Sequence, residues 1–187
     1  TETTPPTEAP PKTIPLEKVA VEAQAILELL QTEGAEEERP AILQTIEEGM
    51  PQVSLELFGI VEEMGSIKDS GRVGRRLVRI DDELVSIDRQ LEEWSNELIT
   101  LTREYQEDLS DINDAAELWA KTRTSVADQD GAESLLAQID RVSAAIQKKR
   151  EQRIAARDVA VEFQTQVSAE TTRLFTVKQE REELSSE

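Results

Sequence analysis

The sequence predicts an all-α protein, an elongated antiparallel helical hairpin of the coiled-coil type with two shorter N-terminal helices packed at its base. Three observations lead to this class. Apolar residues recur every seven positions along a long segment. An acidic stretch in that segment has a basic counterpart in the segment that follows. Aromatic residues make up only 3% of the 187 residues, so the core must consist mainly of Leu, Ile, Val and Ala. Such residues suit helices that pack along narrow seams.

The chain opens with residues 1–15, which hold five of its seven prolines. Proline fixes φ and lacks a backbone donor, and this stretch has few apolar residues to bury, so we expect a disordered leader. The remainder, 16–187, is expected to form a single helical domain. Its first helix is predicted over 16–33, where apolar residues recur at spacings of three and four. Gly34 supplies the stop signal.

The second helix is predicted over 41–65, because Pro40 is a favourable residue at the start of a helix. Pro51 lies inside this range. Proline removes a backbone hydrogen bond and clashes with the preceding turn, so we expect a kink near Gly49. The apolar stripe keeps its phase across Pro51, which favours one kinked helix over two separate ones. A flexible link should follow, since glycine recurs at Gly65, Gly71 and Gly74.

The third helix, predicted over 73–126, carries the strongest signal in the sequence. Two rows of residues repeat there every seven positions, as expected for a heptad seam. The first row is Leu77, Leu84, Leu91, Leu98, Tyr105, Ile112 and Trp119, and the second is Ile80, Ile87, Trp94, Leu101, Asp108 and Ala115. Asp108 is the one charged residue in either row.

The fourth helix is predicted over 131–184. The segment 128–131, Asp-Gln-Asp-Gly, is typical of a turn, and Asp130 with Glu133 has the spacing of a capping box. A reversal at Gln129 would pair residues whose numbers sum to about 258, which brings the apolar rows together. Asp108 then faces Arg150, and we predict that these two residues form a pair that sets the register. Neighbouring charges agree, since acids in one helix oppose bases in the other: Glu104, Glu107 and Asp111 against Lys148, Lys149 and Arg153.

Composition excludes several kinds of chemistry. The chain has no cysteine and no histidine, which rules out a disulfide, a thiol nucleophile, an imidazole base and a His-ligated metal. A formal net charge of -19 argues against binding to nucleic acid or to anionic lipid. No apolar run approaches the roughly 20 residues that span a bilayer.

Paired carboxylates are the remaining candidates for catalysis. Pairs such as Glu47-Glu48 and Glu62-Glu63 could perform acid–base chemistry if a pocket separated their pKa values. They fall between the seam positions, however, so we interpret them as solvated helix faces. No phosphate-binding or dinucleotide-binding loop motif is present. We therefore predict no catalytic, cofactor-binding or metal-binding residue. Trp119 lies on a heptad row, which favours core packing; the alternative is a partly exposed contact near the tip of the hairpin.

Several segments resemble a known family. The stretch Glu117-Leu118-Trp119, with Thr122-Arg123, 131–136, 139–142 and 144–146, is similar to the extramembrane N-terminal helical region of large bacterial MscS-like (small-conductance mechanosensitive) channel proteins. Residues 14–16 and 46–51 resemble the start of that region. The resemblance implies a periplasmic domain that precedes transmembrane helices and a pore. The pore residues of the family match nothing in this chain.

Three hypotheses for function follow. The first is a non-catalytic periplasmic domain of a mechanosensitive ion channel, used for assembly, sensing or spacing above the membrane. Its partners would be other subunits of a homo-oligomeric channel, and it would meet the membrane only through segments outside this chain. The second is a free-standing coiled-coil scaffold or adaptor that binds protein partners. The third, a hydrolase with paired carboxylates, requires a pocket that narrow seams do not supply.

Overall fold

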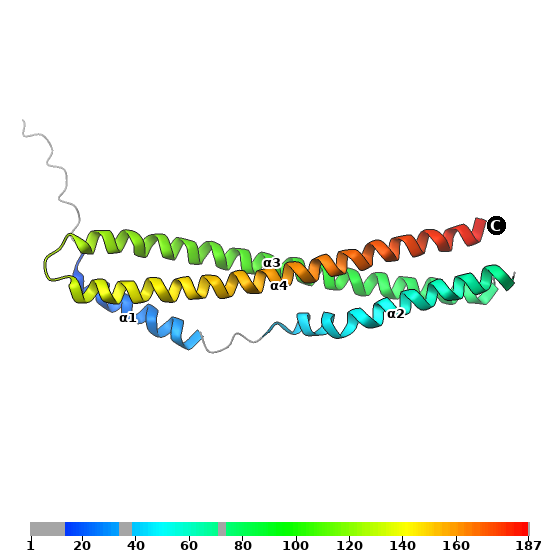
Figure 1. Cartoon of the computed structure of the whole chain (residues 1–187), viewed down its shortest axis with the longest axis horizontal. Helices are drawn as coiled ribbons and strands as arrows, with labels where there is room; N and C mark the ends of the chain where they lie inside the picture. The colour runs from blue at the N-terminus through cyan, green and yellow to red at the C-terminus, as the bar shows by residue number, and fades with distance from the viewer. Residues whose placement is uncertain (1–13, 34–38, 71–73, 187) are drawn as a thin grey trace, which may run out of the picture. The chain divides into compact units, whose positions relative to one another are not determined.

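The computed structural model describes residues 14–33, 39–70 and 74–186, and the chain is all-α over these residues (Figure 1). Almost all of the predicted leader, 1–15, lies outside them. Within the described ranges the chain forms four helices and no strand: α1 (Leu16–Glu33), α2 (Ala41–Ser70), α3 (Gly74–Ala127) and α4 (Glu133–Ser186). Each lies close to its predicted range, and α1 coincides with it. The heptad and helical periodicities therefore identify these helices correctly.

Contacts divide the chain into two compact units. Unit 1 comprises Thr1–Glu37 with Gln106–Ala155, and unit 2 comprises Glu38–Tyr105 with Ala156–Glu187. Both long helices thus contribute a segment to each unit. The predicted single domain over 16–187 thus consists of two compact units.

Unit 2 is a three-helix bundle of α2, the first part of α3 and the last part of α4. Arg173 of α4 donates to Ser54 Oγ of α2, and Arg76 of α3 pairs with Glu63 of α2. Its core uses the predicted heptad rows, because one residue of every helical turn faces the other helices. The buried residues are Leu43, Ile46, Val53, Leu57, Ile60, Met64, Ile67, Leu77, Ile80, Leu84, Ile87, Leu91, Trp94, Leu98, Val167, Leu174 and Val177. The second helix therefore packs along the hairpin, as predicted.

Helix α2 is longer than its predicted range. It continues past Gly65 to Ser70, because Met64 and Ile67 extend the buried stripe into the core of unit 2. Burial of these side chains outweighs the modest helix propensity of glycine, about 1 kcal/mol below that of alanine. Pro51 lies inside the helix, as expected from the unbroken stripe.

Unit 1 is also built from three helices: α1, the end of α3 and the start of α4. Val19 and Ala23 of α1 are buried in one cluster with Trp119 of α3 and Ile139 of α4. Two glutamines hold the backbone of α1 and of the residue before it: Gln138 Nε2 donates to the Ala20 carbonyl of α1 at 3.5 Å, and Gln129 Nε2 donates to the Ile14 carbonyl, two residues before α1, at 3.3 Å.

This position of α1 corrects the prediction that both short helices pack at the base of the hairpin. Helix α1 packs in unit 1 with Trp119 of α3 and Ile139 of α4, whereas α2 packs with the segments of α3 and α4 that belong to unit 2. The apolar stripe of α1 shows which face is buried but not which partner covers it. The seam residues around Trp119 and Ile139 need a third helix to exclude water, and α1 supplies it.

The turn between α3 and α4 differs from its predicted form. Gly131 has a φ of +76°, a conformation that glycine adopts without steric cost. The amide of Leu136 donates to the Ala132 carbonyl at 2.8 Å, which places Ala132 at the N-cap of α4. The predicted capping box, with Asp130 at the N-cap, is therefore wrong, and α4 begins two residues later than the predicted position 131.

Candidate functional site

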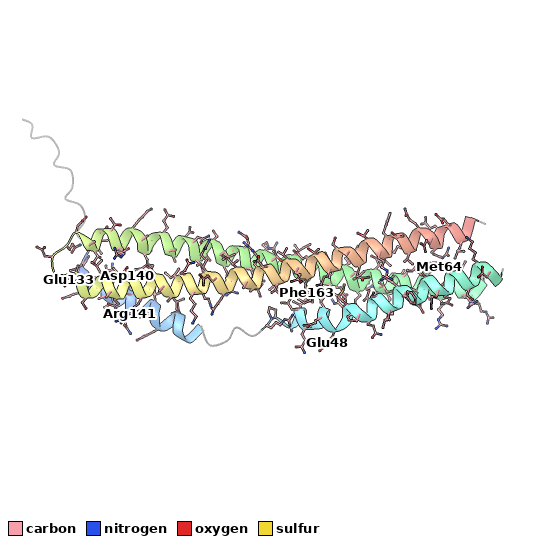
Figure 2. All side chains as sticks on the ribbon, in the orientation of Figure 1. Glu48, Met64, Glu133, Asp140, Arg141 and Phe163 are labelled. Atoms are coloured by element: carbon pink, nitrogen blue, oxygen red, sulfur yellow. The ribbon has the colours of Figure 1, made fainter. Side chains whose placement is uncertain are left out.

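The seam between α3 and α4 brings the charged residues of the sequence analysis together. In unit 1, Arg123 Nε donates to Asp140 Oδ1 at 2.7 Å, and Asp140 lies in the first turns of α4 (Figure 2). This hydrogen bond holds the pKa of the Asp140 carboxyl below its usual value and raises the pKa of the Arg123 guanidinium. Both side chains are about half exposed. The pair therefore selects the register more than it adds stability.

The predicted register pair, Asp108 with Arg150, is not formed. Asp108 Oδ2 lies 3.5 Å from Arg153 Nε, while Arg150 Nε donates to Asn113 Oδ1 at 2.9 Å. The numbers of these pairs sum to 261 and 263, compared with the predicted value of about 258. The physical reason lies in the turn. Its midpoint is Asp130, one residue beyond the predicted reversal at Gln129, and the long arginine side chains reach along the seam.

Unit 2 holds two further cross-helix pairs, which the sequence analysis missed. Arg181 forms a bidentate ion pair with Asp81. Its Nε donates to Oδ1 at 2.6 Å and its Nη2 donates to Oδ2 at 2.7 Å. This two-point hydrogen bonding raises the pKa of Arg181. Lys178 Nζ donates to Asp88 Oδ2 at 2.9 Å. Charges at seven-residue spacing beside the heptad rows were the available signal for Asp81 and Asp88.

Trp119, the candidate contact near the turn, is buried. It is 4% exposed and packs in the core of unit 1 together with Val19 and Ile139. This corrects the alternative of an exposed contact, because α1 covers the face on which Trp119 lies. The structure thus assigns this side chain to packing.

Of the carboxylate pairs Glu47-Glu48 and Glu62-Glu63, three members are exposed and Glu63 is half-buried. Glu47 forms an ion pair with Arg39 at 2.8 Å, and the Arg39 guanidinium lies 5.7 Å from the centre of the Phe163 ring. Glu48 is exposed on α2 (Figure 2). Glu63 pairs with Arg76 at 3.6 Å. Across the described ranges, no group of three or more His, Cys, Asp or Glu side chains is arranged to hold a metal ion.

Unit 2 carries an open groove on its surface. It has a volume of about 710 Å³ and lies between the first turns of α2 and residues 90–104 of α3. Its apolar part consists of Ile42, Trp94 and Leu101, of which the first and last are half-buried at the edge of the core. One wall carries three glutamates: Glu93, Glu97 and Glu104. No sequence pattern predicts this groove, because it arises where α2 begins beside α3.

Comparison with known proteins adds no family to these observations. No family model, no curated protein and no solved structure matches the chain. None of the helices in the described ranges has the combined length and apolar character that crossing a bilayer requires.

Proposed function

We propose that this chain is a non-catalytic helical scaffold that presents helix surfaces to protein partners. One observation carries the proposal: α3 and α4, each of 54 residues, pack against each other through heptad rows of apolar side chains. In the described part of the chain the buried residues are all hydrophobic, with no buried polar or charged side chain. A core of this kind fixes a shape and leaves the chemistry to the surface.

The surface also supports the scaffold proposal. A catalytic pair of carboxylates needs a desolvated setting that drives their pKa values apart. Here Glu47 and Glu63 instead form ion pairs with Arg39 and Arg76. Both acids come from the carboxylate pairs that the sequence analysis weighs as catalytic candidates. Their engagement at the surface favours the scaffold over a hydrolase.

Site-specific photo-cross-linking in the native host tests this proposal. A photoreactive amino acid is placed, one position at a time, at exposed sites of both units, for example Val21, Phe58 and Leu118. A scaffold should give discrete protein adducts from some sites and none from others. Absence of protein adducts at every exposed site would refute it.

The second candidate places the same scaffold in the periplasm, as the extramembrane part of a mechanosensitive channel. It rests on a resemblance to the N-terminal region of MscS-like proteins, carried by residues 14–16, 46–51, 117–119, 122–123, 131–136, 139–142 and 144–146. The full-length gene tests it directly. Under this candidate, sequence beyond Glu187 should encode several apolar spans of roughly 20 residues. A gene with no such span would leave the free-standing scaffold as the function.

A further inference from the structure

We propose that the groove between α2 and α3 binds a basic amphipathic helix of a partner protein. The proposal rests on the scaffold function above and specifies the chemistry of its partner. The occupant would lie along α3, place its apolar residues on Ile42 and Leu101, and direct its Lys or Arg side chains toward Glu93, Glu97 and Glu104.

The apolar part of the groove is suited to helix packing. Ile42 and Leu101 pack against the core of unit 2 with one side and remain partly exposed on the other. Trp94 is 4% exposed and holds the groove in place by packing onto Gly49 of α2. Helix α2 begins at Ala41, so it covers this face of α3 only in part. A helix laid in the groove would bury the remaining apolar surface.

The charged wall determines which helix fits. Glu93, Glu97 and Glu104 are exposed, and within the described ranges none of them takes part in an ion pair. Their spacings of four and seven residues align them along one side of α3 over about 16 Å. Basic residues at matching spacings on a partner helix would meet all three. Charge complementarity of this kind gives orientation and a fast association rate.

Two other occupants are disfavoured by charge. The chain's own segment 34–38 contains Glu36, Glu37 and Glu38, which a wall of glutamates would repel. A second copy carries a net charge of -19, as does the first, so self-association would bring two strongly acidic molecules together. A basic partner helix would meet neither of these charge repulsions.

Peptide binding to the full chain tests the proposal. The probe is a capped helical peptide of about 18 residues, made of leucine, alanine and lysine, with leucines at heptad spacing and lysines along one flank. Titration calorimetry at about 0.1 M salt measures its affinity. We expect binding that weakens about tenfold or more when the groove carboxylates are neutralised by E93Q, E97Q and E104Q together. The same peptide with glutamate in place of lysine should not bind.

Two matched controls separate the groove from general attraction to an acidic protein. The variant E92Q, E107Q and D114N removes the same charge from exposed positions of α3 outside the groove. It should change affinity by less than about twofold. Thr100→Trp fills the groove with its carboxylates intact and should abolish binding, whereas Ser110→Trp, on an exposed position elsewhere on α3, should not.

Several results would overturn the proposal: no binding, equal weakening by both triple variants, or unchanged affinity with Thr100→Trp. Sedimentation of the protein alone adds one more, because a shift from oligomer to monomer in the groove variant would make a second copy the occupant. Cross-linking of α3 to α4 in the same variants shows whether the hairpin persists. Absence of peptide binding to the native chain, with its hairpin intact, would refute this inference and leave the scaffold function unaffected.

Discussion

At the residue scale, Gly49 decides how closely α2 approaches α3. A Cβ atom at this position would lie 2.6 Å from Cη2 and 2.7 Å from Cζ2 of Trp94. Both are atoms of a rigid, buried ring, so they have little freedom to move aside. Glycine is therefore required here for packing, although it lowers the helix propensity of α2.

We expect Gly49→Ala to destabilise the protein by about 1–3 kcal/mol, the usual cost of overpacking a core. Gly59→Ala is the matched control, because beyond its own stretch of helix backbone the added Cβ would meet nothing within 4 Å. That variant should be more stable than the native chain by up to about 1 kcal/mol, since alanine is the better helix former. Urea unfolding of both variants measures the difference, and stabilisation by both would show that Trp94 does not pack on Gly49.

The pair of Arg123 and Asp140 makes a pH-dependent prediction. The hydrogen bond from Arg123 lowers the pKa of Asp140 in the folded state. A lowered carboxyl pKa gives a stabilising contribution that is present above the unfolded-state pKa and is lost as pH falls through the folded-state pKa. In Arg123→Gln, NMR titration should show the pKa of Asp140 rising toward its ordinary value. An unchanged titration of Asp140 would contradict the pairing.

At the element scale, the position of α1 can be tested by substituting one buried and one exposed valine of this helix. Val19 is 2% exposed in the core of unit 1, whereas Val21 is 69% exposed on the same helix. Val19→Asp places a charge without a partner in that core, which is strongly unfavourable. Val21→Asp leaves the charge in water and serves as the control.

Hydrogen exchange should then distinguish the two variants. With Val19→Asp, we expect faster exchange in α1 and in residues 133–146, with little change in α2. Val21→Asp should exchange like the native chain. Faster exchange of α2 in place of residues 133–146 would instead support the predicted packing of α1 at the base.

Most of the helix ranges could be predicted from the sequence, because apolar residues at heptad spacing indicate both a helix and its buried face. The rows from Leu77 to Trp119 predict α3 and its core. Register depends on the turn, and there the left-handed Gly131 shifts the start of α4 in a way that the pattern does not encode. The groove needs the relative placement of α2 and α3, which no local pattern contains. Long arginine side chains also reach along the seam, so Asp108 pairs with Arg153 and not with the predicted Arg150.

At the scale of the whole molecule, the chain carries a formal net charge of -19. Forty acidic residues against 21 basic ones make the folded chain repel itself. Added salt screens this repulsion, with a Debye length that falls from about 30 Å at 0.01 M to about 3 Å at 1 M. We expect the thermal midpoint to rise as salt increases from low ionic strength. A falling midpoint would mean that ion pairs such as Asp81 with Arg181 outweigh the general repulsion.

The antiparallel packing of α3 against α4 underlies both the fold and the proposed scaffold function, and intramolecular cross-linking probes it at a single pair of residues. The natural chain has no cysteine, so Asp88→Cys with Lys178→Cys gives the only two thiols, at residues whose side chains meet at 2.9 Å. A short bis-maleimide reagent should join them within one monomer. The pair Asp88→Cys with Val161→Cys, about 25 Å farther along α4, should remain unjoined. Cross-linking of the second pair, or of neither within a monomer, would contradict the hairpin.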